Sequence, residues 1–424
     1  MGDNTAMTKR LLILLLLTTP VFAQWTPQTN WVQRSVQVWM NTGRFSGSAS
    51  NVAQTALGVF NVWDFGATGS GTNDDAPAIQ AAINAANAGG GSFGGQVVVL
   101  KPYSFYLINE PIYIPPTAGT YSNLRIIGQG PGASLIAGTN MNAVIVVTGD
   151  DVEIANLQFQ NPTGLAANAL VLTEQSSDPN PGVNVHDCYF TSFPNGITWS
   201  GENFKIKDNT FVSCSTAINC TNDGRNSWID HNYILGANTG ILFKKGTMQV
   251  EGTEISDNKD FASAGNGAGI SLTDGLEVYI HDNVVDQTGT NGGALIMGAT
   301  GGTLSRIKVV RNWLVAGANT NYCIFVGGNN SFLTFIDNTL VPADSNATGV
   351  ALSYTTNFNW IANNFLGYFA HPFQFTNPSR FSAYGDSVVP MTFFGIGDTK
   401  GALYEITVND NTTNSPAWRI TWTQ

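Results

Sequence analysis

Seven stretches of the chain decide the fold, and each places alternating apolar residues before an Asn: Phe204-Lys-Ile-Lys-Asp-Asn209, Trp228-Ile-Asp-His-Asn232, Thr253-Glu-Ile-Ser-Asp-Asn258, Val278-Tyr-Ile-His-Asp-Asn283, Ile307-Lys-Val-Val-Arg-Asn312, Leu333-Thr-Phe-Ile-Asp-Asn338 and Asn359-Trp-Ile-Ala-Asn-Asn364. Successive Asn residues stand 23, 26, 25, 29, 26 and 26 positions apart. A unit of this length holds two or three short strands and shows no helical period. It cannot bury an apolar face alone, so it must stack on copies of itself. The repeat therefore predicts an all-β fold in which the chain winds into a coil of parallel strands.

The Asn of each repeat is expected to stabilise this stack. It stands where the strand must bend sharply, and Asn tolerates the left-handed backbone conformation. Its side chain can also hydrogen-bond to the Asn of the next coil, which predicts an asparagine ladder. A second apolar strand gives each coil at least two sheet positions: Asn195-Gly-Ile-Thr-Trp199, Thr239-Gly-Ile-Leu-Phe243, Ala268-Gly-Ile-Ser-Leu272, Gly293-Ala-Leu-Ile296 and Thr348-Gly-Val-Ala-Leu352.

The segment ahead of the repeats predicts a capping helix. Asn73-Asp-Asp-Ala-Pro77 places acidic residues and a Pro where a helix N-terminus favours them. The apolar residues that follow fall on one helical face: Ile79, Ala82, Ile83 and Ala86. Such a helix would cover the open apolar end of the coil, as the terminal unit of a solenoid must.

Composition and charge restrict the class of protein. Only 11% of the 424 residues are charged and 46 are Gly, which disfavours a mainly helical protein. The formal net charge of -11 argues against nucleic acid as a partner, because binding its phosphates requires Lys and Arg. The four cysteines lack the spacing of a zinc site. We interpret them as small packing residues, with a disulfide between Cys214 and Cys220 as the alternative.

The N-terminus has the pattern of a secretory signal peptide. Lys9 and Arg10 precede the apolar run Leu11–Leu17, and small residues precede Gln24. We place cleavage after Ala23, so residues 1–23 form the signal peptide and the protein is secreted, either to the extracellular space or to a periplasm. The apolar run is too short for a membrane anchor, which requires about 20 residues, and no later segment is a candidate membrane span.

The residues before the repeats resemble a known family. Phe60-Asn-Val-Trp-Asp-Phe-Gly-Ala-Thr-Gly-Ser-Gly-Thr-Asn-Asp-Asp75, the predicted helix and Leu124-Arg-Ile-Ile-Gly-Gln-Gly-Pro-Gly-Ala133 resemble the N-terminal segment of the pectate-lyase-like superfamily, which includes rhamnogalacturonase-like hydrolases and epimerases. The resemblance implies a single-stranded right-handed parallel β-helix that acts on polysaccharide. We assign residues 58–375 to this β-helix, 24–57 to an N-terminal extension and 376–424 to a C-terminal β cap.

Outward side chains of the strand before each Asn form the candidate site. Side chains alternate along a strand and stack from coil to coil, so the repeat aligns two outward columns. Titratable and aromatic residues concentrate in the middle of these columns: Lys205, Lys207, Trp228, Asp230, Glu254, Tyr279, His281 and Lys308. The equivalent column of the second strand, from Thr198 to Ala351, offers almost nothing titratable. One face of the coil is therefore chemically distinctive.

The residue types of this face suggest their roles. Asp230 and Glu254 are diagonal neighbours at about 7–8 Å, a spacing that suits an acid and base pair or a shared cation. The candidates for catalysis are Asp230, Glu254, His281 and Lys207. The candidates for substrate binding, by charge neutralisation or stacking on a sugar ring, are Lys205, Trp228, Tyr279 and Lys308. The alternative is an ordinary solvated surface, in which Lys207 pairs with Asp230 and Lys308 pairs with Glu254.

One motif of this face bears on a cofactor. Trp228-Ile-Asp-His231 is similar to the Trp-Ile-Asp-His motif of calcium-dependent pectate lyases, and this resemblance makes Asp230 a calcium ligand. The next coil reads Asn238-Thr-Gly-Ile-Leu-Phe-Lys-Lys245 and lacks the Asp-Gly pair of that family. The aspartates directly before a ladder Asn are interpreted as turn formers: Asp208, Asp257, Asp282 and Asp337.

The charged strip favours an enzyme that acts on an acidic, uronate-containing polysaccharide by β-elimination. In that reaction a Lys or His removes the proton next to the carboxylate. The alternatives are a glycoside hydrolase on the same fold and a non-catalytic β-helix that binds glycans or forms a surface structure. Polysaccharide is thus the expected partner and calcium the one expected cofactor, while the sequence predicts neither the polymer nor the oligomeric state.

Overall fold

The computed structural model describes residues 58–89, 96–115, 123–129, 132–173, 182–244, 246, 250–262, 267–287, 293–298, 302–317, 322–342, 347–353, 359–362, 364–366, 371–376, 381–384, 404–407 and 419–422. Contacts within the chain separate residues 1–59 from residues 60–424. The predicted signal peptide and almost all of the predicted N-terminal extension lie outside the described residues.

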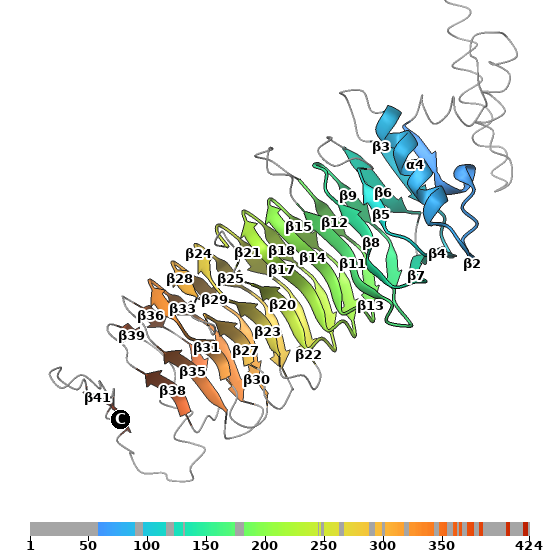
Figure 1. The fold of residues 1–424 in the computed structure, drawn as a ribbon. Helices are drawn as coiled ribbons and strands as arrows, with labels where there is room; N and C mark the ends of the chain where they lie inside the picture. The colour runs from blue at the N-terminus through green and yellow to red at the C-terminus, as the bar shows by residue number, and fades with distance from the viewer. Residues whose placement is uncertain are drawn as a thin grey trace, which may run out of the picture. The chain divides into compact units, whose positions relative to one another are not determined.

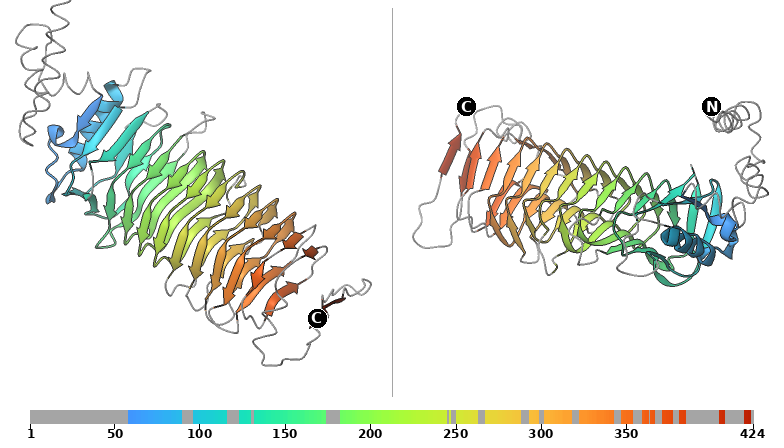
Figure 2. Two further views of the ribbon diagram at one scale, coloured as in Figure 1. Left: turned by 180° about the vertical axis from the view of Figure 1, so that it is seen from behind. Right: turned by 90° about the horizontal axis from the view of Figure 1, so that it is seen from above.

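Three parallel sheets form the walls of a right-handed β-helix (Figures 1 and 2). Sheet A has 13 strands: β1 (Val59–Asn61), β3 (Gln96–Leu100), β6 (Leu124–Gly128), β9 (Glu153–Ala155), β12 (Asn184–His186), β15 (Lys205–Lys207), β18 (Trp228–Asp230), β21 (Glu254–Ser256), β25 (Tyr279–His281), β29 (Lys308–Val310), β33 (Thr334–Ile336), β36 (Asn359–Ala362) and β39 (Phe381–Tyr384). Each strand pairs only with the strands of neighbouring coils, so the predicted coil of parallel strands is confirmed.

Sheets B and C complete each coil, so a coil has three strands where the sequence required at least two. Sheet B has 12 strands: β2 (Ser70–Asp74), β4 (Ser104–Ile108), β7 (Ala133–Ala137), β10 (Gln158–Gln160), β13 (Tyr189–Thr191), β16 (Thr210–Val212), β19 (Tyr233–Leu235), β22 (Lys259–Ala262), β26 (Val284–Gln287), β30 (Trp313–Ala316), β34 (Thr339–Pro342) and β37 (Phe365–Leu366). Sheet C has 11 strands: β5 (Ile112–Ile114), β8 (Met141–Val147), β11 (Ala166–Thr173), β14 (Asn195–Glu202), β17 (Thr216–Arg225), β20 (Thr239–Phe243), β23 (Ala268–Leu272), β27 (Gly293–Met297), β31 (Tyr322–Val326), β35 (Thr348–Ser353) and β38 (His371–Thr376).

A ladder of buried asparagines lies at the bend between sheets A and B. The side-chain amide of each Asn donates to the side-chain oxygen of the next, at 2.9–3.1 Å, through Asn209, Asn232, Asn258, Asn283, Asn312, Asn338 and Asn364. The sequence predicted that the Asn itself would adopt the left-handed conformation, and this was wrong. The residue before it does so: φ is 55° at Asp208, 52° at His231 and 54° at Asp257. This residue turns the backbone, which lets the following Asn point inward and satisfy the buried polar groups of the bend.

The interior of the coil is filled by inward-facing apolar side chains of all three sheets. On sheet B, the rings of Phe159, Phe190 and Phe211 stack with centroids 5.0 and 4.7 Å apart. Asp260 occupies the same inward column, between Ile234 and Val285, and is 2% exposed. Burial raises the pKa of this carboxyl well above its usual value, and Asp286 raises it further.

Helix α4 (Ala76–Gly89) follows the short 3-10 helix η1 (Val62–Phe65) and packs against η1, β3 and β5 (Figure 1). The predicted apolar face is confirmed, because Ile79, Ala82, Ile83 and Ala86 are all buried. Asp75 lies between β2 and α4 and is also buried. Its carboxylate accepts hydrogen bonds from the backbone N–H groups of residues 68 and 69, which fixes the turn that leads into the helix.

Several other predictions can be compared with the described residues. All four cysteines are buried thiols, which confirms their role in packing. The strands of the coil continue past residue 375 to β39, and the tail adds an antiparallel pair, β40 (Tyr404–Thr407) and β41 (Arg419–Trp422). The other predicted tail strand, residues 389–394, lies outside the described residues. A short fourth sheet contains β24 (Gly275–Leu276), β28 (Thr303–Ser305) and β32 (Asn329–Ser331). None of the described helices has the length and apolarity to cross a membrane.

Candidate functional site

The outer face of sheet A carries the predicted strip in the predicted register. Lys205, Trp228, Glu254, Tyr279 and Lys308 are successive Cα partners across β15, β18, β21, β25 and β29. The second column runs through Lys207, Asp230, Ser256 and His281 across the same strands. Asp230 and Glu254 are therefore diagonal neighbours, as predicted.

A third column of outward side chains runs beside these two, at the residue before each ladder Asn. Strict alternation would point this residue inward, but its left-handed backbone breaks the alternation and leaves its side chain outside. The column consists of Asp208, His231, Asp257, Asp282, Arg311 and Asp337, and Asp187 has the equivalent place before Cys188. Asp208, Asp257, Asp282 and Asp337 form turns, as predicted. Three aspartates of this column, Asp187, Asp257 and Asp282, also join the clusters described below.

The first cluster is centred on His281, whose side chain is only 12% exposed. The ring nitrogen Nε2 lies 2.8 Å from Glu254 Oε1, and Nδ1 lies 2.7 Å from Asp282 Oδ2. Arg311 donates to both oxygens of Asp282, through Nε at 2.9 Å and Nη2 at 2.6 Å. The Tyr279 ring stacks on the imidazole with centroids 4.0 Å apart, and its hydroxyl is near enough to Arg311 to add to the rise in the pKa of the guanidinium. Five side chains from three coils thus form one network.

Charge sets the ionisation of this cluster. The bidentate bond from Arg311 lowers the pKa of Asp282 to about 2, against the smaller opposing effect of desolvation, and His281 lowers it further. Asp282 in turn raises the pKa of Arg311. An ionised carboxylate and a guanidinium therefore flank the imidazole and the phenol at neutral pH.

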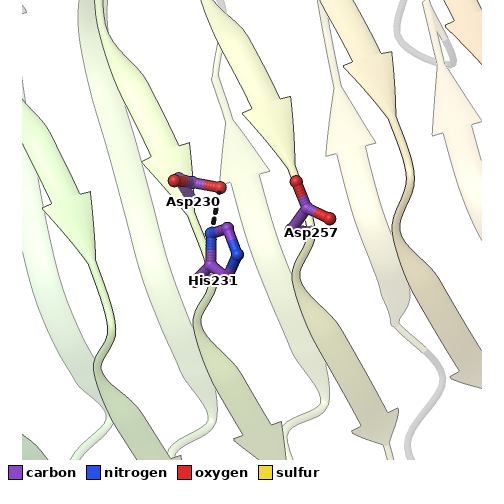
Figure 3. A group of neighbouring side chains, drawn as sticks. All are labelled: Asp230, His231 and Asp257. Atoms are coloured by element: carbon purple, nitrogen blue, oxygen red, sulfur yellow. Dashed lines mark hydrogen bonds and ion pairs between the residues drawn. The ribbon is translucent and has the colours of Figure 1, made fainter.

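The second cluster joins Asp230, His231 and Asp257, and Figure 3 shows Asp257 on the coil next to the bonded pair. His231 Nδ1 lies 2.7 Å from Asp230 Oδ1, and Ser256 donates to that oxygen at 3.0 Å. One ligand atom from each of the three acidic or imidazole side chains lies within 4.8 Å of the others. Calcium prefers six to eight oxygen ligands, so the two carboxylates fit this ion, while the imidazole nitrogen fits a transition metal better.

The remaining predicted residues flank the two clusters. Lys205 places its ammonium group 5.5 Å from the centre of the Trp228 ring, and that tryptophan is 41% exposed. Lys308 is exposed and follows Tyr279 by one coil. Among the described residues, no ion pair joins Lys207 to Asp230 or Lys308 to Glu254. The predicted alternative of simple surface pairs therefore does not describe these carboxylates, whose recorded partners are His231 and His281.

A third imidazole repeats the first arrangement at the other end of the strip. His186 lies 3.1 Å from Glu153 through Nε2 and 2.7 Å from Asp187 through Nδ1. Arg125 binds both oxygens of Glu153, which lowers the pKa of that carboxyl. Asn184 takes the place that Tyr279 has in the first cluster, since each stands two residues before the imidazole on its strand. This cluster therefore shares the imidazole and carboxylates but lacks the phenol.

Sequence reasoning missed Asp282, Arg311, His231 and Asp257 as members of the site. The aspartates before the ladder Asn were interpreted as turn formers only, and His231 and Arg311 were given no role, because strand alternation assigns no outward position there. Their sequence signal was the clustering of His, Asp and Arg at one fixed repeat position, which is unusual for a position that needs only a turn.

Comparisons with known proteins agree with this architecture. A family model described as "Rhamnogalacturonase A/epimerase, pectate lyase-like" matches residues 59–153, and one described as "Right handed beta helix region" matches residues 142–314. Mannuronan C5-epimerase AlgE3 of Azotobacter vinelandii is 61% identical over 51 residues, which are 12% of this chain and 3% of that protein. Mannuronan C5-epimerase AlgE1 of the same organism is 41% identical over 80 residues, or 18% of this chain and 5% of that protein.

Solved structures show the same fold at low identity. The A-module of Azotobacter vinelandii mannuronan C-5 epimerase AlgE6 superimposes with a TM-score of 0.52 and 13% identity, over 77% of this chain and 99% of that chain. The Dettilon tailspike protein superimposes with a TM-score of 0.53 and 14% identity, over 78% of this chain and 71% of that chain. These likenesses concern the fold, and the chain spans only a small part of the curated relatives it matches.

Proposed function

Because the chain is a right-handed β-helix protein of the pectate-lyase-like superfamily, we propose that it acts on an acidic polysaccharide bound along the outer face of sheet A. The observation that carries this proposal is the network of Tyr279, His281, Glu254, Asp282 and Arg311. It places a phenol, an imidazole and a guanidinium among basic side chains that suit a uronate polymer. The epimerase relatives support the same class of substrate, since mannuronan is a polymer of uronate.

The proposed reaction starts with removal of the proton on the carbon next to the uronate carboxylate. Charge on the carboxylate must be neutralised as the carbanion develops, and Lys308 and Arg311, which both belong to the coil after Tyr279, are placed for this purpose. Both ring nitrogens of His281 lie within hydrogen-bond distance of a carboxylate. We therefore assign the proton transfer to the phenol oxygen of Tyr279, which acts as the base after losing its own proton to solvent, and assign His281 and Glu254 the positioning of the phenol ring.

Two outcomes can follow from the same carbanion. In β-elimination, its electron pair forms the double bond between C4 and C5, the glycosidic bond at C4 breaks, and the departing oxygen takes up a proton. In epimerisation, a proton returns to C5 from the opposite face and no bond of the chain breaks. We propose β-elimination as the reaction. The similarity to two mannuronan C5-epimerases makes C5-epimerisation the second candidate.

The proposal is tested by turnover of mannuronan, polygalacturonate and related polymers, each with and without calcium. Products of β-elimination absorb in the near ultraviolet, whereas epimerisation changes the C5 configuration without shortening the polymer. His281→Asn should reduce either activity by about 10²- to 10⁴-fold, the usual contribution of a catalytic acid–base group and its support. His186→Asn is the matched control, because it breaks the same kind of imidazole and carboxylate network away from the phenol. Equal losses of activity in His281→Asn and His186→Asn would mean that the network around His281 has only a structural role.

A calcium ion is part of this proposal at the second cluster. Asp230 and Asp257 would hold the ion, which would supply positive charge next to a bound uronate carboxylate. Export of the protein is also proposed, on the basis of the N-terminal pattern of residues 9–23. The mass of the mature N-terminus after expression in a secreting host tests it, with Gln24 as the expected first residue.

A further inference from the structure

The outer face of sheet B is apolar over six successive strands, from β16 to β34. On each of these strands the central inward side chain is buried, and the residues on either side of it form two outward columns. The first column consists of Thr210, Tyr233, Lys259, Val284, Trp313 and Thr339, and the second contains Val212, Leu235, Asp286, Val315 and Val341. We call these two columns the sheet B face.

Large apolar side chains of the sheet B face are exposed to solvent in the single chain. Trp313 is 50% exposed, Leu235 is 41% exposed and Tyr233 is 40% exposed. The outer face of sheet A carries the charged strip instead, so an apolar surface is not a general property of this coil. A contiguous apolar patch on the outside of a protein marks a site of interaction, and an interface between copies of one chain is more apolar than the rest of the surface.

The order of residues along the sheet B face is self-complementary. Lys259 and Asp286 are the charged residues of the two columns, and they lie on β22 and β26, the two middle strands of the six. Away from this centre, each column repeats similar residues on both sides. The matched pairs are Tyr233 with Trp313, Thr210 with Thr339, Leu235 with Val315 and Val212 with Val341. A surface that contacts itself across a two-fold axis requires such a match.

We propose that the sheet B face binds the same face of a second copy of the chain, about a two-fold axis that runs in the strand direction between β22 and β26. The two coils are then antiparallel. Tyr233 of each copy lies opposite Trp313 of the other, and Lys259 of each copy lies beside Asp286 of the other. Opposite charges therefore meet twice at the centre, and aromatic rings cover one another on both sides of it. This inference does not depend on the proposed function.

The size of the contact predicts a weak dimer. An axis at this place brings the eight strands from β13 to β37 of each copy against those of the other. At about 4.8 Å between strands and about 13 Å across four residues, the contact covers about 500 Å² of each copy, or about 1,000 Å² in total. Interfaces of this size are at the lower end of those that hold two proteins together. We therefore expect a reversible dimer whose population rises with protein concentration.

Sedimentation velocity of the full chain at increasing concentration tests the dimer. Lys259→Asp and Asp286→Lys each place like charges at the centre of the contact, and each should weaken dimerisation at least about tenfold. An equimolar mixture of these two variants should dimerise as the parent protein does, because each copy then meets the opposite charge on the other. Lys244→Asp, the same change of charge at an exposed residue just after β20, should leave dimerisation unchanged. Trp313→Gln should weaken dimerisation without any change of charge.

Several results would overturn the proposal. One is a parent protein that remains monomeric at about 200 µM. A dimer that persists in both charge variants would place the contact on another face. Charge variants that stay monomeric when mixed would mean that the two substitutions act within one chain. A monomeric parent protein that binds a neutral glucan, and binds it more weakly after Trp313→Gln, would assign the sheet B face to carbohydrate.

Discussion

Removal of one rung from the asparagine ladder should destabilise the coil that carries the His281 cluster. The Asn283 side chain donates to the backbone oxygens of Ile255 and His281, each at 2.9 Å, and to Asn312 Oδ1 at 3.0 Å. Its own oxygen accepts from the backbone and side-chain nitrogens of Asn258, both at 3.0 Å. The residue is 1% exposed, so water does not replace these partners in a folded Asn283→Ala protein.

The magnitude follows from the partners that remain. After the substitution, Asn312 Oδ1 still accepts from the backbone N–H of residue 283, and the Asn258 amide still donates to Ile229. The carbonyl of His281 still accepts from the backbone N–H of Asp257. The backbone N–H of Asn258 loses its recorded acceptor and the carbonyl of Ile255 loses a recorded donor. At about 1–3 kcal/mol for each of these two buried groups left unsatisfied, the loss is about 2–6 kcal/mol.

Urea unfolding followed by circular dichroism measures this loss as a lower midpoint. Thr303→Ala, an exposed substitution on β28, is the control and should stay within about 0.5 kcal/mol of the parent protein. A loss below about 1 kcal/mol for Asn283→Ala would refute the reasoning, because it would mean that the ladder bonds add nothing beyond what the strands already provide.

Three further predictions concern charge. Arg311→Gln should lower stability slightly near pH 6, and the difference should vanish as pH falls from about 4 to 2. The pKa of Asp282 is lowered to about 2 chiefly by Arg311, so the stability that the ionised carboxylate adds is present above its unfolded pKa and is lost as pH falls through its folded pKa. Equal pH profiles would contradict this. Asp260→Asn should raise the melting temperature at pH 8 but not at pH 3. The pKa of the buried Asp260 carboxyl is raised in the folded state, so folding becomes less favourable once pH exceeds the pKa of this group in the unfolded chain. A gain at pH 3 equal to that at pH 8 would exclude this cause. Calcium should raise the melting temperature of the parent protein but not that of Asp257→Asn, and an equal shift in both would place any calcium elsewhere.

Much of the fold could be predicted from the sequence, because one repeat determines it. The spacing of Asn209 to Asn364 specifies parallel stacking, and the alternation before each Asn specifies which side chains face outward, so the register of Trp228, Glu254 and Tyr279 followed directly. The apolar face of α4 followed from its 3.6-residue period. These features depend on local pattern, which a single sequence contains.

The candidate site could be predicted only in part, for two physical reasons. Alternation holds within a strand but fails at the left-handed residue that ends it, so the outward direction of His231 and Asp282 was not predicted. Long side chains also reach across coils, and which carboxylate Arg311 or His281 binds depends on side-chain conformation rather than on register. The alternative interpretation paired Lys207 with Asp230 and Lys308 with Glu254, which the register allows, but imidazoles bind those carboxylates instead.

The proposed reaction requires Tyr279 to remove the proton from C5 of a uronate, and hydrogen exchange at that carbon reports on this step. Mannuronate oligosaccharides are incubated with the protein in deuterated water and analysed by nuclear magnetic resonance and mass spectrometry. We expect loss of the C5 proton, seen as unsaturated ends or as deuterium at C5, with the parent protein and with His186→Asn but not with Tyr279→Phe. New reducing ends with the C5 proton intact, or the same loss of that proton with Tyr279→Phe, would rule out this role of Tyr279.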